Sequence, residues 1–156
     1  MKRLRHLFIV ISLLGSLSWH GTAQAEHLQM LRSSEPFPET MSLLQETIKK
    51  QGYTVSRVQR VDIGLSKSGY KTDKYRVVFF GKDKEIQGLL KSHPQIAPYL
   101  PLKIVIYAEQ TDTILVSLDP DQFIKLFPDV KQQQMFMRWN KDVHAIFDQM
   151  RLKTKE

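Results

Sequence analysis

The chain has 156 residues, 23 Lys+Arg against 16 Asp+Glu, and no cysteine. Without cysteine there is no thiol nucleophile, no C-x-x-C redox pair, no iron–sulfur site and no covalent c-type haem attachment. The basic residues are scattered and form no run that would follow a nucleic acid backbone, so we expect no nucleic acid partner.

The first 25 residues have the three parts of a secretory signal peptide. Basic residues precede an eleven-residue apolar run at 7–17, and an Ala-x-Ala site ends at Ala25. We expect cleavage after Ala25, a mature chain of net charge +4 from Glu26, and a periplasmic location in a bacterium. An uncleaved membrane anchor fits less well, because a span needs about 20 apolar residues. No later segment is long and apolar enough to span a bilayer.

The first half of the mature chain is predicted to contain one helix among strands. Met41, Leu44 and Ile48 recur at helical spacing before Gly52, whereas the run YRVVFF is typical of a central strand. The apolar alternation slips between Val55 and Val58, which predicts a β-bulge. In chain order we expect a short strand at 31–34, a helix at 39–51, a strand at 53–63, a turn-rich connection at 64–73 and a strand at 75–80.

The second half is predicted to place a hairpin between helices. Three prolines in HPQIAPYLP favour an extended segment, and Ile114, Val116 and Leu118 alternate on one strand face. Asp119 is expected to cap a helix, with Gln122 completing a capping box. In chain order we expect a helix at 83–92, an extended segment at 93–101, strands at 102–109 and 114–118, a helix from 119 broken at Pro128, and a helix at 130–152.

This order of elements predicts one α+β domain over residues 26–156. It lacks the βαβαβ alternation of a doubly wound sheet, so we expect a mostly antiparallel sheet covered by helices on one face. The apolar seam of the last helix is predicted to be core. Its members are Met135, Trp139, Val143, Ile146 and Met150.

Candidate catalytic groups are few. His27, His93 and His144 show no metal-ligand spacing, so no metal or cofactor is assigned. Glu109 and Asp119 are expected near one end of the sheet, where two carboxylates would allow acid–base work, although capping is the expected main task of Asp119. We therefore assign no catalytic residue.

The densest polar cluster surrounds the turn-rich connection. Its charged members either form solvated surface ion pairs or make a binding rim on a rigid sheet. Four tyrosines, at 70, 75, 99 and 107, would line a pocket or serve as ordinary sheet and core residues. We select as ligand-binding candidates Asp62, Lys67, Tyr70, Lys74 and Arg76.

Several segments in this order resemble the domain of unknown function 302 family over Ser33 to Phe127. They are QGYTVSRV, VDIGLSKSGY, VVFFG, PLKIVIYAE and SLDPDQF. The resemblance implies a curved antiparallel sheet under helices, similar to the TATA-binding-protein-like arrangement, with an extra helix from Val130 beyond the family region. Members often carry Asp-His where this chain has Asp62-Ile63, so an activity that needs that histidine would be missing here.

The leading hypothesis is a non-catalytic periplasmic binding or accessory module. Its partner would be a small ligand or a periplasmic protein, held at the polar rim. One alternative is a redox or metal-linked accessory protein or enzyme with a noncovalent metal or haem at His93 or His144. Another is a homo-oligomeric structural protein, such as a homodimer, docked through the Trp139 seam.

Overall fold

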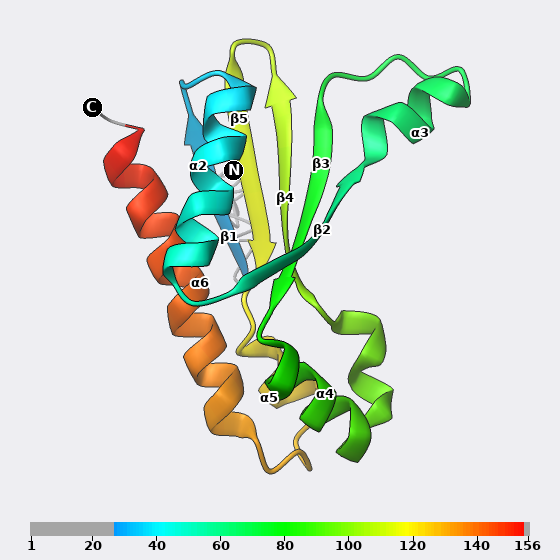
Figure 1. Ribbon diagram of the computed structural model, residues 1–156, viewed down its shortest axis with the longest axis vertical. Coiled ribbons are helices and arrows are strands. Elements are labelled where there is room, and N and C mark those ends of the chain that lie inside the picture. Colours follow the sequence, from blue (N-terminus) through cyan, green and yellow to red (C-terminus); the bar gives the residue numbers. More distant parts are fainter. Residues whose placement is uncertain (1–26, 155–156) are drawn as a thin grey trace, which may run out of the picture.

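A computed structural model describes residues 27–154, in which five strands form one antiparallel sheet flanked by helices (Figure 1). The signal peptide predicted at 1–25 lies outside these residues. The strands are β1 (Leu28–Ser33), β2 (Thr54–Arg60), β3 (Tyr75–Gly81), β4 (Leu102–Glu109) and β5 (Asp112–Leu118). The helices are α2 (Phe37–Lys50), α3 (Val61–Lys67), α4 (Asp83–Ser92), the 3-10 helix η1 (Pro94–Tyr99), α5 (Gln122–Leu126) and α6 (Gln133–Lys153).

The strand order is β1-β5-β4-β3-β2, and every neighbouring pair is antiparallel. The α+β class with a mostly antiparallel sheet is therefore confirmed. β3 lies inside the sheet between β2 and β4, as the run YRVVFF predicts. The register of β2 against β3 shifts between Val55 and Arg57, which confirms the expected bulge.

Helices cover one face of this sheet. Alternate strand residues such as Val78, Ile104 and Leu115 are fully buried and join one core with residues of α2, α4 and α6. Trp139 is 1 % exposed in this core, and its Nε1 donates a hydrogen bond to Oε2 of Glu85 at 2.8 Å. The Trp139 seam is thus core within the single chain, as predicted from its spacing. Among residues 27–154, no helix is long and apolar enough to cross a membrane.

Two connections differ from their predicted structures. Residues 61–67 form α3 in place of the end of a strand and the start of a turn. Asp62 in its first turn suits the helix dipole, and the helix ends where Gly69 adopts φ of 86° and donates its N–H to Ser66. The segment predicted as extended forms η1, because Ile96 is fully buried and i to i+3 hydrogen bonds compact the chain around it.

The start of α5 also differs. Asp121, not Asp119, is the N-cap residue, and no side chain caps this helix. Asp119 contributes only its backbone carbonyl, which accepts from the N–H of Gln122 at 3.1 Å. Its carboxylate is directed at other partners, described below.

Candidate functional site

Two of the five predicted rim residues form an ion pair. Arg76 in β3 donates to Oδ1 of Asp62 at the start of α3, and the two side chains are only 13 % and 15 % exposed. The hydrogen bond from Arg76 is the main reason that the pKa of Asp62 lies below its usual value. Arg76 also lies over the Phe37 ring of α2, 5.8 Å from its centroid. This pair joins three elements, so its first role is structural.

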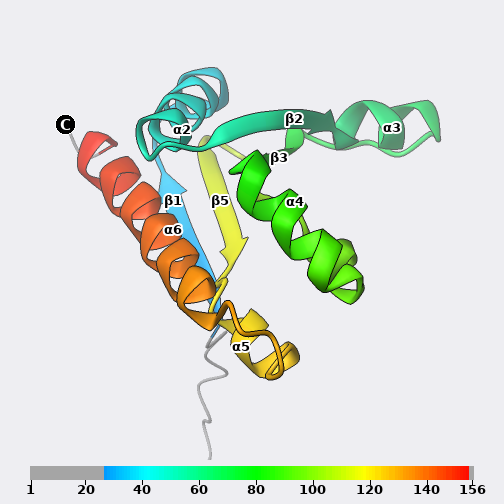
Figure 2. The same cartoon turned by 60° about the horizontal axis from the view of Figure 1, so that its bottom comes forward.

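Lys67 and Tyr70 lie away from that pair. α3 contributes no buried residue, and both views show it projecting from the rest of the molecule (Figures 1 and 2). Lys67 is exposed at the end of α3, and Tyr70, three residues after Lys67, is 66 % exposed. Neither residue lines the hollows described next. The structure thus divides the predicted rim into a structural pair, a projecting arm and Lys74.

Lys74 stands between two adjoining hollows at the end of the sheet that carries the β4–β5 turn. The larger, of about 390 Å³, has Tyr75 and Tyr107 in its wall, and their rings pack edge to face at 6.2 Å. The smaller, of about 270 Å³, reaches toward α2. The two share Asp73, Lys74 and Ala108. The backbone N–H of Ala108 donates to the carbonyl of Lys74 at 2.9 Å, which ties the loop to β4.

The lining supplies an aromatic wall and mixed charge. The Lys74 ammonium lies 5.8 Å from the centroid of the Phe37 ring, which itself lines the smaller hollow. Asp112 there is already bonded to Arg32 at 2.7 Å, a contact that leaves its charge partly neutralised. The chemistry of this lining suits a small molecule with a ring and one charged group, because rings pack on rings and an ammonium binds an anion.

The sequence identified part of this lining. Tyr75 and Tyr107 were among the four pocket candidates. Tyr99, another of the four, packs edge to face on Phe123 and Phe127 and lines a separate small hollow of about 30 Å³. Phe37 was missed. Its signal was weak, because a Phe just before an expected helix suits a helix start as well as a ligand wall.

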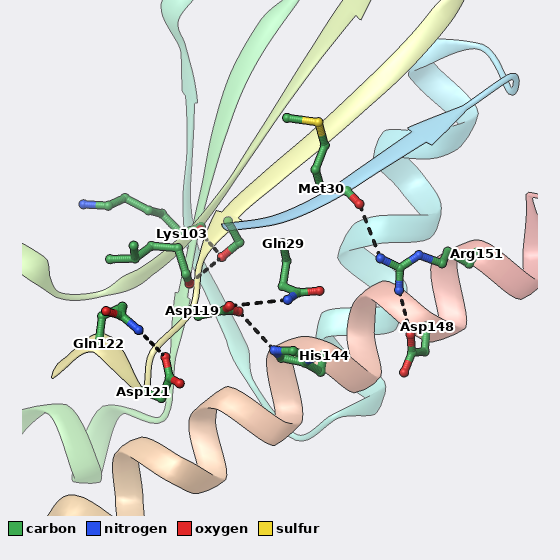
Figure 3. Close-up of polar contacts among 11 residues, drawn as sticks. Gln29, Met30, Lys103, Asp119, Asp121, Gln122, His144, Asp148 and Arg151 are labelled. Carbon is green, nitrogen blue, oxygen red and sulfur yellow. Dashed lines mark hydrogen bonds and ion pairs between the residues drawn. The ribbon is translucent and has the colours of Figure 1, made fainter. Parts of the chain in front are cut away.

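A second polar cluster joins β1, the end of β5 and α6 (Figure 3). His144 Nε2 lies 3.0 Å from Oδ1 of Asp119, and Gln29 donates to Oδ2 of Asp119 at 3.4 Å. The Asp119 side chain is 12 % exposed and that of His144 is 42 % exposed. These contacts attach α6 to the sheet. Glu109 is far from them, at the opposite end of the β4–β5 hairpin, so the expected Glu109–Asp119 pair was wrong.

The histidines considered as cofactor ligands lie on separate elements. His93 Nδ1 contacts the Ser92 hydroxyl at 2.8 Å at the end of α4, while His144 contacts Asp119. Within the part of the chain that the structure describes, no three His, Cys, Asp or Glu residues gather closely enough to hold a metal ion.

Fold and site together define an α+β domain with an open, aromatic-walled hollow at one end of its sheet. The family model "Domain of unknown function DUF302" matches residues 29–150, and the chain belongs to this family. The match includes most of α6, so the expectation that this helix lies beyond the family region was wrong. No curated protein matches the chain.

A solved structure supports the same fold. It is the crystal structure of an uncharacterized conserved DUF302 protein from Bacillus stearothermophilus. The two share 21 % identity with a TM-score of 0.70, over 80 % of this chain and 98 % of the other. At this identity the likeness concerns the fold alone.

Proposed function

We propose that this protein is a non-catalytic binding module that holds a small aromatic anion in the hollows beside Lys74. The observation that carries the proposal is the meeting of two hollows, of about 390 and 270 Å³, at a segment where Lys74, next to Asp73, is, among residues 27–154, the one lysine in either lining. Tyr75 and Tyr107 offer a ring wall to the apolar body of the ligand, and the ammonium of Lys74 offers its charge to a carboxylate.

The other rim residues have different places in this proposal. The Asp62–Arg76 pair supports the lining of the smaller hollow. It holds Arg76 over the ring of Phe37, which is part of that lining. Lys67 and Tyr70 belong to the projecting arm and are not assigned to ligand contact.

We also propose that the module works in the periplasm after export. This part rests on the basic residues, apolar run and Ala-x-Ala site at 1–25. Expression of the full-length gene followed by cell fractionation tests it. We expect the protein in the periplasmic fraction with an intact mass that begins at Glu26. A cytoplasmic chain that retains Met1 would contradict it.

The binding proposal is tested by amide NMR with phenylacetate as the probe. We expect phenylacetate to shift the amides of residues 72–75, 107 and 108, and we expect the phenethylammonium cation to leave them unchanged. Lys74→Ala should lose the response, because it removes the cation that both hollows share. Lys71→Ala is the matched control, since Lys71 is exposed on the same loop and lines neither hollow. An equal response in both variants would refute the site.

A further inference from the structure

Among residues 27–154, no helix covers the face of the sheet opposite α2 and α6 (Figures 1 and 2). Leu28 and Leu118 pair across β1 and β5 and are 42 % and 37 % exposed, and the neighbouring Met30 is 56 % exposed. The same face continues across the inner strands, as the alternation of buried and partly exposed residues in β3, β4 and β5 shows. We call this surface the open face; its apolar members are Leu28, Met30, Val77, Phe79, Val105, Tyr107, Val116 and Leu118.

The open face buries one residue of its own. Ile114 points to this side, opposite Arg32 and Tyr107 in the register, and is only 2 % exposed although it is not part of the helix-side core. An antiparallel sheet with one solvated face normally alternates apolar and polar residues. Here the alternate residues of β3 and the middle of β1, β4 and β5 are apolar as well, whereas polar residues border them, namely Arg32, Arg57, Gln59, Lys103 and Glu109. A contiguous apolar surface with a polar border marks an interaction site.

We propose that the open face packs against the open face of a second copy of this chain. The charges at the ends of β4 favour this occupant. Lys103 and Glu109 both belong to the open face, are exposed, and stand at opposite ends of the strand. Glu109 and Asp112 share the single guanidinium of Arg32 in the same chain, so this end of the strand keeps a net negative charge, and the Glu109 side chain remains 47 % exposed. Consider a two-fold axis that lies in the interface and runs perpendicular to the strands. It stacks β4 of one copy on β4 of the other copy, with the two strands running in opposite directions. Lys103 then meets the partner's Glu109, and Glu109 meets the partner's Lys103.

The area of the open face fits such a pairing. Five strands about 4.8 Å apart, with about six residues each at 3.4 Å per residue, cover roughly 500 Å². Two copies together bury about 1,000 Å², the lower bound of a specific interface. The apolar centre and charged ends match the core and rim of such interfaces, and two sheets stack about 10 Å apart.

This inference goes beyond ligand binding, and the two sites share only Tyr107. The residues varied to test it, Met30, Lys103 and Glu109, line neither hollow, so its failure is distinguishable from failure of the ligand site. Sedimentation equilibrium on the protein made from its full-length gene, with each intact mass recorded, should give twice the chain mass. Met30→Glu should raise the dissociation constant by about a hundredfold or more, because symmetry buries two unpaired carboxylates. Met137→Glu is the matched control, since Met137 is 52 % exposed on α6 and should leave the dimer intact. A monomeric wild type, or a Met30→Glu dimer of unchanged strength, would overturn the proposal.

A charge exchange tests the orientation. Lys103→Glu and Glu109→Lys should each weaken the dimer roughly tenfold, because each replaces two attractive contacts by two repulsive ones. The double variant should restore it. Single variants that bind like the wild type, or a double variant weaker than either single one, would exclude the two-fold arrangement proposed here.

Discussion

The two faces of the sheet use the same strands for different purposes. On the helix side, Val78, Ile104 and Ile106 are fully buried in the core that the sheet shares with the helices. On the open face, the residues between them are also apolar but remain partly exposed. The comparison teaches that β3 and β4 carry apolar residues on both faces, although the described chain buries only one of them fully. The helices of the same chain cover one face, and we propose that a second copy of the chain covers the open face.

The largest expected difference between the two sheet faces comes from replacing two neighbouring phenylalanines of β3 by alanine, one at a time. Phe80 is fully buried and packs edge to face on Tyr53 at 5.5 Å, whereas Phe79 lies on the open face. Phe80→Ala should lower the free energy of unfolding by about 3–5 kcal/mol. Phe79→Ala should cost less than about half of that. Urea unfolding measures both.

These two variants are best made in the Met30→Glu background, so that assembly does not add to the measured stability. Equal losses for Phe79→Ala and Phe80→Ala in that background would mean that the two faces are equally packed within one chain, contrary to the comparison.

A smaller effect is expected from the hydrogen bond that joins α6 to α4 on the covered side. Trp139→Phe should cost about 2 kcal/mol, because the half-buried carboxylate of Glu85 loses its 2.8 Å donor from the buried indole. Arg138→Gln serves as the control. It removes the other partner of Glu85, at 2.7 Å, but Arg138 is 48 % exposed and the loss should be about 0–1 kcal/mol. If both variants unfold at the same urea concentration, the indole hydrogen bond is not the stronger contact.

The smallest effect concerns Asp62 and depends on pH. Asp62→Asn should lower the free energy of unfolding by about 1 kcal/mol at neutral pH, because Arg76 loses a charged acceptor. The pKa of Asp62 is depressed in the folded protein, so its contribution is present above the ordinary value of 3.8 and is lost as the pH falls through the folded value.

Unfolding of wild type and Asp62→Asn should therefore converge below about pH 3.8. Glu46→Gln, which breaks the exposed pair with Lys50, should lose less at neutral pH. A gap between wild type and Asp62→Asn that stays constant from neutral pH into acid would refute the role of the ionised pair.

Sequence reasoning predicted some elements to the residue, and the reason is local. The helix at 83–92 and the strand at 102–109 agree with α4 and β4, because their periodicity and flanking residues are self-contained. The candidate site was harder to predict. Lys74, Tyr75 and Tyr107 were named, yet their common wall requires Tyr75 to stand opposite Tyr107 in the β3–β4 register.

Some errors had a cause in the sequence itself. Glu109 adjoins the hairpin turn and Asp119 follows the other end of the same hairpin, so an antiparallel pairing separates them. α3 was missed because its seven residues are too few for a clear helical period and include Gly64.

The sequence by itself determined the α+β class, the family resemblance and most strand and helix positions, since these depend on side-chain periodicity and on residues close in the chain. Only the tertiary structure decided that Asp119 binds His144, 25 residues away, and that Asp62 pairs with Arg76. It also decided that, among residues 27–154, one largely apolar sheet face is left without a covering helix. The physical reason is that long-range contacts depend on strand register and helix docking, which local patterns do not encode.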